Sequence, residues 1–170
     1  MIIKRYPYIL LAALIALTLG SCMKEDSNAP LDAAVEQVTR EQYYIREYLR
    51  TNRQDSGLIV HPSGMCYKII EHGNSRDFIT AENVPVVVFE RSVFPTGKIL
   101  ESSLGLPTSF DGRKLKDHIL GWQIGLPIVS KGGRIIMYIP SALGFGITGI
   151  PGIIPPNTIL ICDVTLVNFK

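Results

Sequence analysis

The sequence lacks the features of a metalloprotein, a nucleic-acid-binding protein or a membrane-spanning protein. Its three cysteines, Cys22, Cys66 and Cys162, do not have the spacing of metal ligands. The formal net charge is only +2 and no basic patch is present, so we expect no nucleic-acid partner. The longest apolar run covers about a dozen residues, whereas a transmembrane helix needs about 20. We therefore expect neither a metal site nor a spanning helix.

That apolar run, residues 8–19, follows Lys4 and Arg5 and is typical of a secretory signal. It ends in Leu19-Gly20-Ser21-Cys22, which resembles the lipobox of bacterial lipoproteins. The resemblance implies that residues 1–21 are a signal peptide, cleaved before Cys22. It also implies that Cys22 carries diacylglyceryl and palmitate-type acyl chains, which together give durable anchoring. An ordinary signal peptide followed by an incidental cysteine is the alternative.

Acyl chains rather than charge would hold the mature protein on a membrane. Loss of Lys4 and Arg5 takes the formal net charge from +2 to 0, because residues 1–21 contain no acidic residue. The segment Lys24-Glu25-Asp26 resembles the charged signals that send some Gram-negative lipoproteins to the outer face of the outer membrane. A solvated linker is the alternative. We expect a lipid-anchored outer-membrane protein of the cell envelope, on either the periplasmic or the surface face.

Residues 22–56 are predicted to form a polar tether and an N-terminal helix over residues 32–52. Val38, Ile45, Tyr48 and Leu49 fall on one face at helical spacing. We interpret the helix as one that packs on its own domain or acts as a spacer. A dimerisation helix is the alternative, but one helix of about five turns gives a small interface, so a monomer is expected.

The pattern changes to strands from Leu58 onward, and the 15 Gly and 11 Pro suit a turn-rich β fold. One internal helix is predicted over residues 119–126. Strands around one short helix give an α+β domain, which we place at residues 57–170. A disulfide between Cys66 and Cys162 is compatible with an oxidising envelope, but two separately buried thiols are preferred. The predicted strands are residues 65–71, 84–91, 98–102, 134–139 and 158–169.

The C-terminal half contains an ordered series of motifs. They are Gly121-Trp122, Lys131-Gly132-Gly133-Arg134, Ile139-Pro140, Gly144-Phe145-Gly146, the segment 148–158 (TGIPGIIPPNT) and Asp163-Val164-Thr165-Leu166, preceded by Glu101-Ser102-Ser103 and by residues 63–68. In this order and spacing they resemble the FKBP-type peptidyl-prolyl cis-trans isomerases, strongly over residues 84–170. The resemblance implies an FKBP-like antiparallel β-sheet wrapped around one short helix.

The resemblance also implies an isomerase of X-Pro bonds in proline-containing unfolded, exported or envelope proteins. Amide resonance opposes rotation about this bond with a barrier of about 18–20 kcal/mol. A dry apolar pocket holds the prolyl ring and removes the water that stabilises the planar amide. The chemistry therefore needs no metal, nucleophile or cofactor.

The residue roles are carried over by position. Trp122 would lie beneath the prolyl ring, Ile119 would supply a wall and a backbone N–H, and Glu101 falls where the family has an aspartate near the twisting carbonyl. His118, beside Ile119, is interpreted as a surface residue and not as a general base. The predicted catalytic residues are Phe89, Glu101, Ile119, Trp122 and Phe145, and the predicted substrate-binding residues are Leu100, Phe110, Ile153, Ile154 and Cys162.

Several of these positions depart from the family pattern. Phe89 and Phe145 stand where a tyrosine is common, and Leu100 and Cys162 replace aromatic walls. We therefore expect weaker catalysis than in family members with a full aromatic set. The alternatives are a catalytically weak chaperone or protein-binding module of the envelope, and a structural lipoprotein whose pocket is vestigial.

Overall fold

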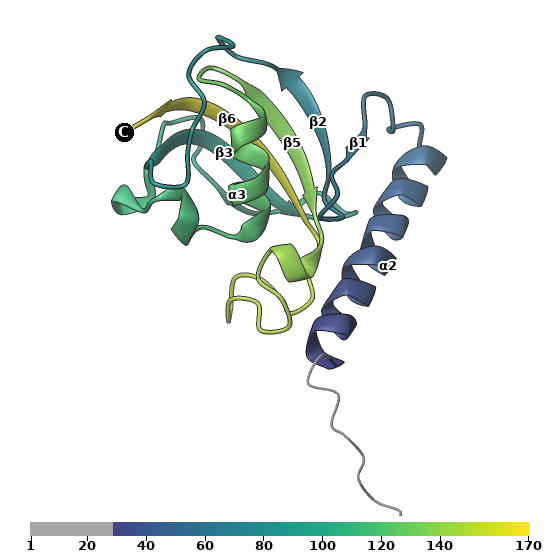
Figure 1. Ribbon diagram of the computed structural model, residues 1–170. Coiled ribbons are helices and arrows are strands. Elements are labelled where there is room, and N and C mark those ends of the chain that lie inside the picture. The colour runs from purple at the N-terminus through teal and green to yellow at the C-terminus, as the bar shows by residue number, and fades with distance from the viewer. Residues whose placement is uncertain (1–28) are drawn as a thin grey trace, which may run out of the picture. The chain divides into compact units, whose positions relative to one another are not determined.

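Alternating apolar residues form one antiparallel sheet (Figure 1). The computed structural model describes residues 29–170, so the predicted signal peptide and the predicted lipidation of Cys22 lie outside the described residues. The sheet has the order β1-β2-β5-β6-β3-β4. The predicted sheet is confirmed, its longer strands starting and ending within two residues of the expected positions, whereas the short β1 was not predicted. The strands are β1 (Ile59–Val60), β2 (Cys66–Glu71), β3 (Pro85–Val93), β4 (Lys98–Ser102), β5 (Arg134–Ile139) and β6 (Leu160–Phe169).

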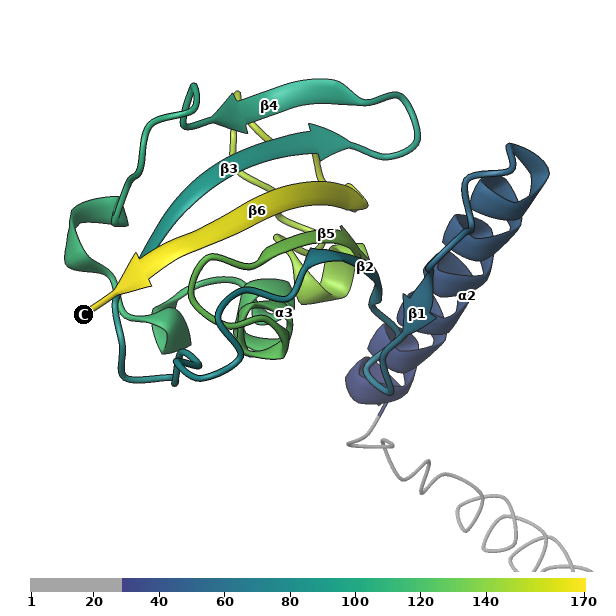
Figure 2. The same ribbon diagram turned by 90° about the horizontal axis from the view of Figure 1, so that it is seen from above.

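The internal helix α3 (Leu120–Gly125) covers one face of this sheet, as Figure 2 shows from above. Successive side chains of a strand point to opposite faces. The inward residues of β6 are therefore Leu160, Cys162, Val164 and Leu166, all of which are buried in the main core. A single 3-10 turn, Leu126–Ile128, continues the helix. The helix predicted over residues 119–126 is confirmed, although its α-helical segment is shorter by one residue at each end.

Gly121 allows α3 to approach β5 closely. A Cβ atom at this position would lie 2.6 Å from side-chain atoms of Ile139. This separation is shorter than a van der Waals contact, so any larger residue would push the helix away from the sheet. Trp122, the next residue, is completely buried in the same core. The Gly-Trp pair thus sets both the depth of the helix and the position of its indole ring.

The N-terminal helix α2 (Ala29–Thr51) packs against the domain through a second cluster. Ile45 and Leu49 are buried there with Phe94 and Tyr138. Tyr138 lies between Met137 and Ile139 on β5, which both point into the main core, so the second cluster lies on the opposite face of the sheet. This confirms the interpretation that the helix packs on its own domain. Residues 33–170 form one compact unit.

Polar contacts also join α2 to the segment that follows β5. The carboxylate of Glu41 accepts hydrogen bonds from the backbone N–H of Ser141, at 2.6 Å, and from its hydroxyl group, at 2.7 Å. Gln37 donates to the Ser141 hydroxyl oxygen at 2.8 Å and to the Asn157 side chain at 3.1 Å. Ser141 is completely buried. The helix therefore supplies partners that this buried serine needs.

Cys66 and Cys162 are free, buried thiols in different clusters. Cys66 faces α2, whereas Cys162 faces α3 through the main core. This confirms the expectation of two separately buried thiols rather than a disulfide. Burial raises the pKa of Cys66 to about 11, against a weaker opposing effect of Arg46. Of the helices within residues 29–170, none has the length and apolar character needed to cross a membrane.

Candidate active site

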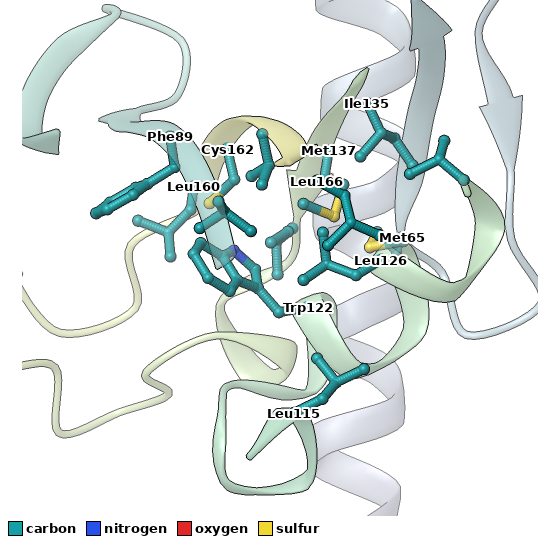
Figure 3. Close-up of a cluster of buried hydrophobic side chains, with 14 of the residues drawn as sticks. Met65, Phe89, Leu115, Trp122, Leu126, Ile135, Met137, Leu160, Cys162 and Leu166 are labelled. Atoms are coloured by element: carbon teal, nitrogen blue, oxygen red, sulfur yellow. The ribbon is translucent and has the colours of Figure 1, made fainter. Parts of the chain in front are cut away.

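Three aromatic rings from different segments of the chain meet at one end of α3. The centroid of the Trp122 ring lies 5.6 Å from that of Phe89 on β3 and 5.4 Å from that of Phe110 in the loop after β4. The two phenylalanine rings are 5.1 Å apart. Figure 3 shows Phe89 and Trp122 in the main cluster, with Cys162 of β6 nearby. Edge-to-face contacts of this kind stabilise aromatic clusters beyond the area that they bury.

Ile119 precedes α3 and places a backbone donor beside the cluster. Its carbonyl oxygen accepts hydrogen bonds from the N–H groups of Trp122 and Gln123, which begins the helix. Its own N–H takes part in none of the hydrogen bonds found within residues 29–170. The first N–H groups of a helix have no partner inside the helix and can bind a ligand carbonyl. The Ile119 side chain is half-buried against the main core.

The segment after β5 supplies the other wall. Phe145 and Ile154 pack in the main core, and Ile154 is buried. Ile150 and Ile154 form an isolated β-bridge with backbone hydrogen bonds of 2.8 Å in both directions. Gly149 makes this turn possible, because its φ is +63° and a Cβ atom there would overlap the carbonyl oxygen of Ile154. Ile153, by contrast, is 54% exposed and does not join the cluster.

Arg91, which the sequence interpretation did not include, occupies the middle of this site. Its guanidinium carbon lies 5.2 Å from the ring centroid of Phe145, 5.4 Å from that of Trp122 and 5.6 Å from that of Phe89. The side chain forms an ion pair with Glu101 on the neighbouring strand β4. Alternation along β3 offered a signal, because Arg91 shares the inward face of Val87 and Phe89.

His118 also belongs to the site, and its interpretation as a surface residue is wrong. The imidazole ring is half-buried and stacks on Trp122, with centroids 5.3 Å apart and an interplanar angle of 22°. It also meets the Phe110 ring edge-on at 5.2 Å. Burial lowers the pKa of His118 and outweighs the opposing effect of a hydrogen bond to the Arg113 carbonyl oxygen, and the charges of Arg113 and Arg91 also lower it. The imidazole is therefore neutral at pH 7 and acts as a third aromatic neighbour of the indole.

Two buried donors in the site have no hydrogen-bond partner among residues 29–170: Arg91 Nε and Trp122 Nε1. Cys162 lies beside both side chains, and they lower the pKa of its thiol, although burial dominates and raises that pKa. A buried donor without a partner costs about 1–3 kcal/mol. Both donors are enclosed in the core beside the Cys162 thiol, so neither faces solvent.

An open pocket of about 410 Å³ adjoins the aromatic cluster. Phe89, Phe110 and Glu101 line it on one side, and the loop that includes Leu104 and Leu106 lines the other. Leu104 and Leu106 are 88% and 70% exposed. The pocket thus offers apolar surface to a polypeptide that reaches the cluster from solvent.

The structure brings nine of the ten predicted site residues to this region. Eight of them belong to the main core or pack against it, namely Phe89, Leu100, Phe110, Ile119, Trp122, Phe145, Ile154 and Cys162. Glu101 joins them through Arg91, whereas Ile153 faces solvent. Within residues 29–170 no group of three or more His, Cys, Asp or Glu side chains is placed to hold a metal ion. The arrangement can hold a small apolar ring and offer the backbone N–H of Ile119 to a carbonyl oxygen.

Comparison with known proteins agrees with this geometry. Residues 80–167 match the family model described as FKBP-type peptidyl-prolyl cis-trans isomerase. Over 127 residues the chain is 34% identical to the FKBP-type peptidyl-prolyl cis-trans isomerase FkpA of Escherichia coli strain K12, which covers 74% of this chain and 45% of that protein. Over the same length it is 32% identical to the peptidyl-prolyl cis-trans isomerase Mip of Coxiella burnetii, covering 74% of this chain and 53% of Mip.

The solved structures include a crystal structure of FkpA from Escherichia coli, which matches with a TM-score of 0.65 and 27% identity. That match covers 99% of this chain and 84% of the FkpA chain. The chain spans about half the length of the curated relatives that it matches. A family match over more than half of the sequence, together with the sheet, the central helix and the aromatic cluster, shows that the chain belongs to the FKBP-type peptidyl-prolyl cis-trans isomerase family.

Proposed function

We propose that this protein is a peptidyl-prolyl cis-trans isomerase that acts through the aromatic cluster around Trp122. The observation that carries the proposal is the meeting of Phe89, Phe110 and Trp122 within 6 Å of one another, beside the unpartnered N–H of Ile119. The prolyl ring would lie against Trp122, and the Ile119 N–H would bind a substrate carbonyl oxygen. Phe89, Phe145 and Ile154 would exclude water from the twisting amide.

The chemistry follows from the loss of amide resonance in the transition state. Water stabilises the planar amide by hydrogen bonding to its carbonyl oxygen, so an apolar wall destabilises the ground state relative to the twisted form. The Ile119 donor holds one side of the peptide, which leaves a single bond free to rotate. No covalent step is required, and proton transfer is not required either.

The proposed site of action is the cell envelope, with proline-containing exported proteins as substrates. The apolar run before Cys22 and the lipobox-like segment 19–22 support export and lipid anchoring. Proteins that cross a membrane unfolded must adopt the native isomer at each X-Pro bond afterwards. Spontaneous isomerisation takes tens to hundreds of seconds, so an anchored isomerase at the site of arrival would accelerate folding.

The test is a prolyl-isomerisation assay with the soluble chain, residues 23–170, and a peptide that has leucine before proline. We expect measurable but modest acceleration at micromolar enzyme. Trp122→Phe should remove most of the acceleration while it keeps an aromatic ring in the core. Circular dichroism checks that the variant is folded. Tyr43→Phe, an equally small change at a 66% exposed site on α2, should leave the rate unchanged. A folded wild-type chain without any acceleration would exclude this function.

A second candidate function is a binding module that holds unfolded chains without isomerising them. The exposed Leu104 and Leu106 beside the open pocket favour it, because they offer apolar surface that is independent of Trp122. Suppression of aggregation of a denatured protein separates the two functions. A pure binding module should lose this activity on Leu104→Ser and Leu106→Ser together, and should keep it on Trp122→Phe.

A further inference from the structure

We propose that Arg91 determines whether a prolyl ring reaches Trp122: its guanidinium group occupies the space between the aromatic walls and must move for substrate to enter. The effect on substrate binding rests on the proposed isomerase function. The covering of Trp122 by Arg91 does not depend on that function. It identifies Arg91 as a residue that controls access of substrate to the site.

The position of the guanidinium group is the first argument. Its central carbon is 5.2 to 5.6 Å from the ring centroids of Phe145, Trp122 and Phe89. These are three of the rings that would surround a bound proline, so the group lies where the substrate ring is expected. Trp122 is completely buried, although its predicted role requires contact with substrate. Arg91 itself is only 6% exposed.

The strand register explains why Arg91 lies there. Arg91 is paired directly with Glu101 on β4 and with Cys162 on β6, so the three residues form one row across three strands. Cys162 has a small side chain and leaves room for the long arginine. Glu101 holds the guanidinium group from the other side through the ion pair. The small Cys162 side chain, which stands where the family has an aromatic residue, and the long Arg91 side chain thus pack together as a pair.

The arrangement can also open. Arg91 Nε is buried without a hydrogen-bond partner among residues 29–170, so the side chain is not fully satisfied in its present position. Glu101 is 42% exposed in its side chain and lines the open pocket of about 410 Å³. A rotation of Arg91 toward that pocket would keep the ion pair, hydrate Nε and uncover the indole of Trp122. His118 would still stack on the indole.

The consequence for binding follows from what substrate must displace. Cation–π contacts of a desolvated guanidinium group with several rings favour the closed position. A peptide must overcome this preference, which lowers its apparent affinity by the fraction of open molecules. Removing the guanidinium group should therefore raise kcat/KM for the leucine-proline peptide by about tenfold, chiefly through KM.

Trp122 is the single tryptophan of the sequence, so its fluorescence reports directly on this site. The experiment measures acrylamide quenching of that fluorescence and peptide isomerisation, with residues 23–170. Arg91→Ala empties the space, whereas Arg91→Met fills it with an uncharged chain of similar length. Arg134→Ala is the matched control, since Arg134 also forms a strand-to-strand ion pair, with Asp163, but lies 45% exposed outside the site.

We expect Arg91→Ala to raise both quenching and kcat/KM, Arg91→Met to leave quenching low, and Arg134→Ala to change neither. If Arg91→Ala fails to fold, Glu101→Gln serves instead, because it loosens the guanidinium group without deleting it and should raise quenching. Unchanged quenching in folded Arg91→Ala, or in folded Glu101→Gln where it replaces Arg91→Ala, overturns the inference whatever the activity. Raised quenching with no isomerisation in any variant supports the covering role of Arg91 and refutes the isomerase function, so the two failures are distinguishable.

Discussion

Phe145 lies in the wall of the site with an aromatic ring but no hydroxyl group. Its ring is half-buried and faces the guanidinium group of Arg91 at 5.2 Å. Phe145→Tyr adds a donor that can bind a substrate carbonyl oxygen, and such a hydrogen bond contributes about 0.5–1.5 kcal/mol. We therefore expect kcat/KM for the leucine-proline peptide to rise about two- to tenfold. Steady-state isomerisation rates of the two proteins provide the measurement.

The matched control for this change is Phe169→Tyr, which adds the same hydroxyl group at the end of β6, beside Pro85. It should leave the rate unaltered. Equal rates for Phe145→Tyr and the wild-type protein, with both folded, would show that a hydroxyl group has no role at residue 145.

Cys66 is expected to lower the stability of the protein at alkaline pH. Burial raises the pKa of its thiol from 9.0 to about 11 in the folded state, so above pH 9 the unfolded chain loses a proton that the folded chain retains. The free energy of unfolding must then fall as the pH rises from 9 to 11, by about 1–3 kcal/mol. Burial also raises the pKa of the neighbouring Tyr138, which adds a decrease of the same sign at higher pH.

Urea unfolding between pH 8 and pH 10.5 measures this effect. Cys66→Ala should be less stable at pH 8, because it leaves a small cavity, but its stability should decline less steeply with pH. Parallel curves for the wild type and the variant would mean that the thiol does not titrate differently in the two states.

At this scale the sequence indicated Glu101 and most aromatic residues of the site, but it did not indicate two polar neighbours, Arg91 and His118. Trp122 and Phe89 follow from the resemblance to the FKBP family, which implies a role for each position. Arg91 and His118 do not, since their burial depends on space left by residues that are distant in the sequence. Cys162 creates some of that space, and its contact with Arg91 requires the register between β3 and β6.

Among the helices and strands, α2 has the packing partners that are hardest to predict from the local sequence. Its apolar face predicts that it packs against something, and Ile45 and Leu49 are indeed buried. The partner could not be predicted, because Ser141 lies 100 residues after Glu41 and nothing in either segment indicates the other. Some ends of β2, β3 and β6 also differ from the predicted positions by one or two residues, since hydrogen bonding with neighbouring strands rather than local preference sets where a strand stops.

Glu41 provides a test of this contact between α2 and the segment after β5. Glu41→Ala removes three hydrogen bonds to a charged acceptor, one from Gln37 and two from Ser141. It leaves the N–H and hydroxyl groups of the buried Ser141 with fewer partners. We expect a loss of about 1–3 kcal/mol in the free energy of unfolding. Chemical denaturation is the measurement.

Glu36→Ala is the matched control, because Glu36 lies on the same helix in an exposed pair with Arg40 and should change stability by less than about 0.5 kcal/mol. Similar losses for both variants would mean that the effect arises from helix propensity and not from Ser141. We also predict that residues 57–170 fold without α2. The same contacts imply that they would do so with reduced stability.

At the scale of the whole molecule, the lipobox-like segment predicts a covalent anchor outside the described residues. Cys22→Ala removes the thiol that would receive the acyl chains, so the protein should no longer incorporate labelled palmitate and should leave the membrane fraction. Expression with metabolic labelling and membrane fractionation is the measurement. Cys66→Ala serves as the control, because Cys66 is a buried thiol and should leave incorporation unchanged. Label retained by Cys22→Ala would exclude this anchor.

The order of the strands has a consequence for folding during synthesis of the protein. β6 is made after every other strand, yet it lies between β5 and β3 and pairs with both. Until residues 160–169 have been synthesised, no strand joins β5 to β3, and the main core lacks Leu160, Cys162, Val164 and Leu166. Folding during translation therefore cannot reach completion before this strand emerges. A polypeptide that cannot complete its fold until β6 is available is well suited to passage through a membrane as an extended chain.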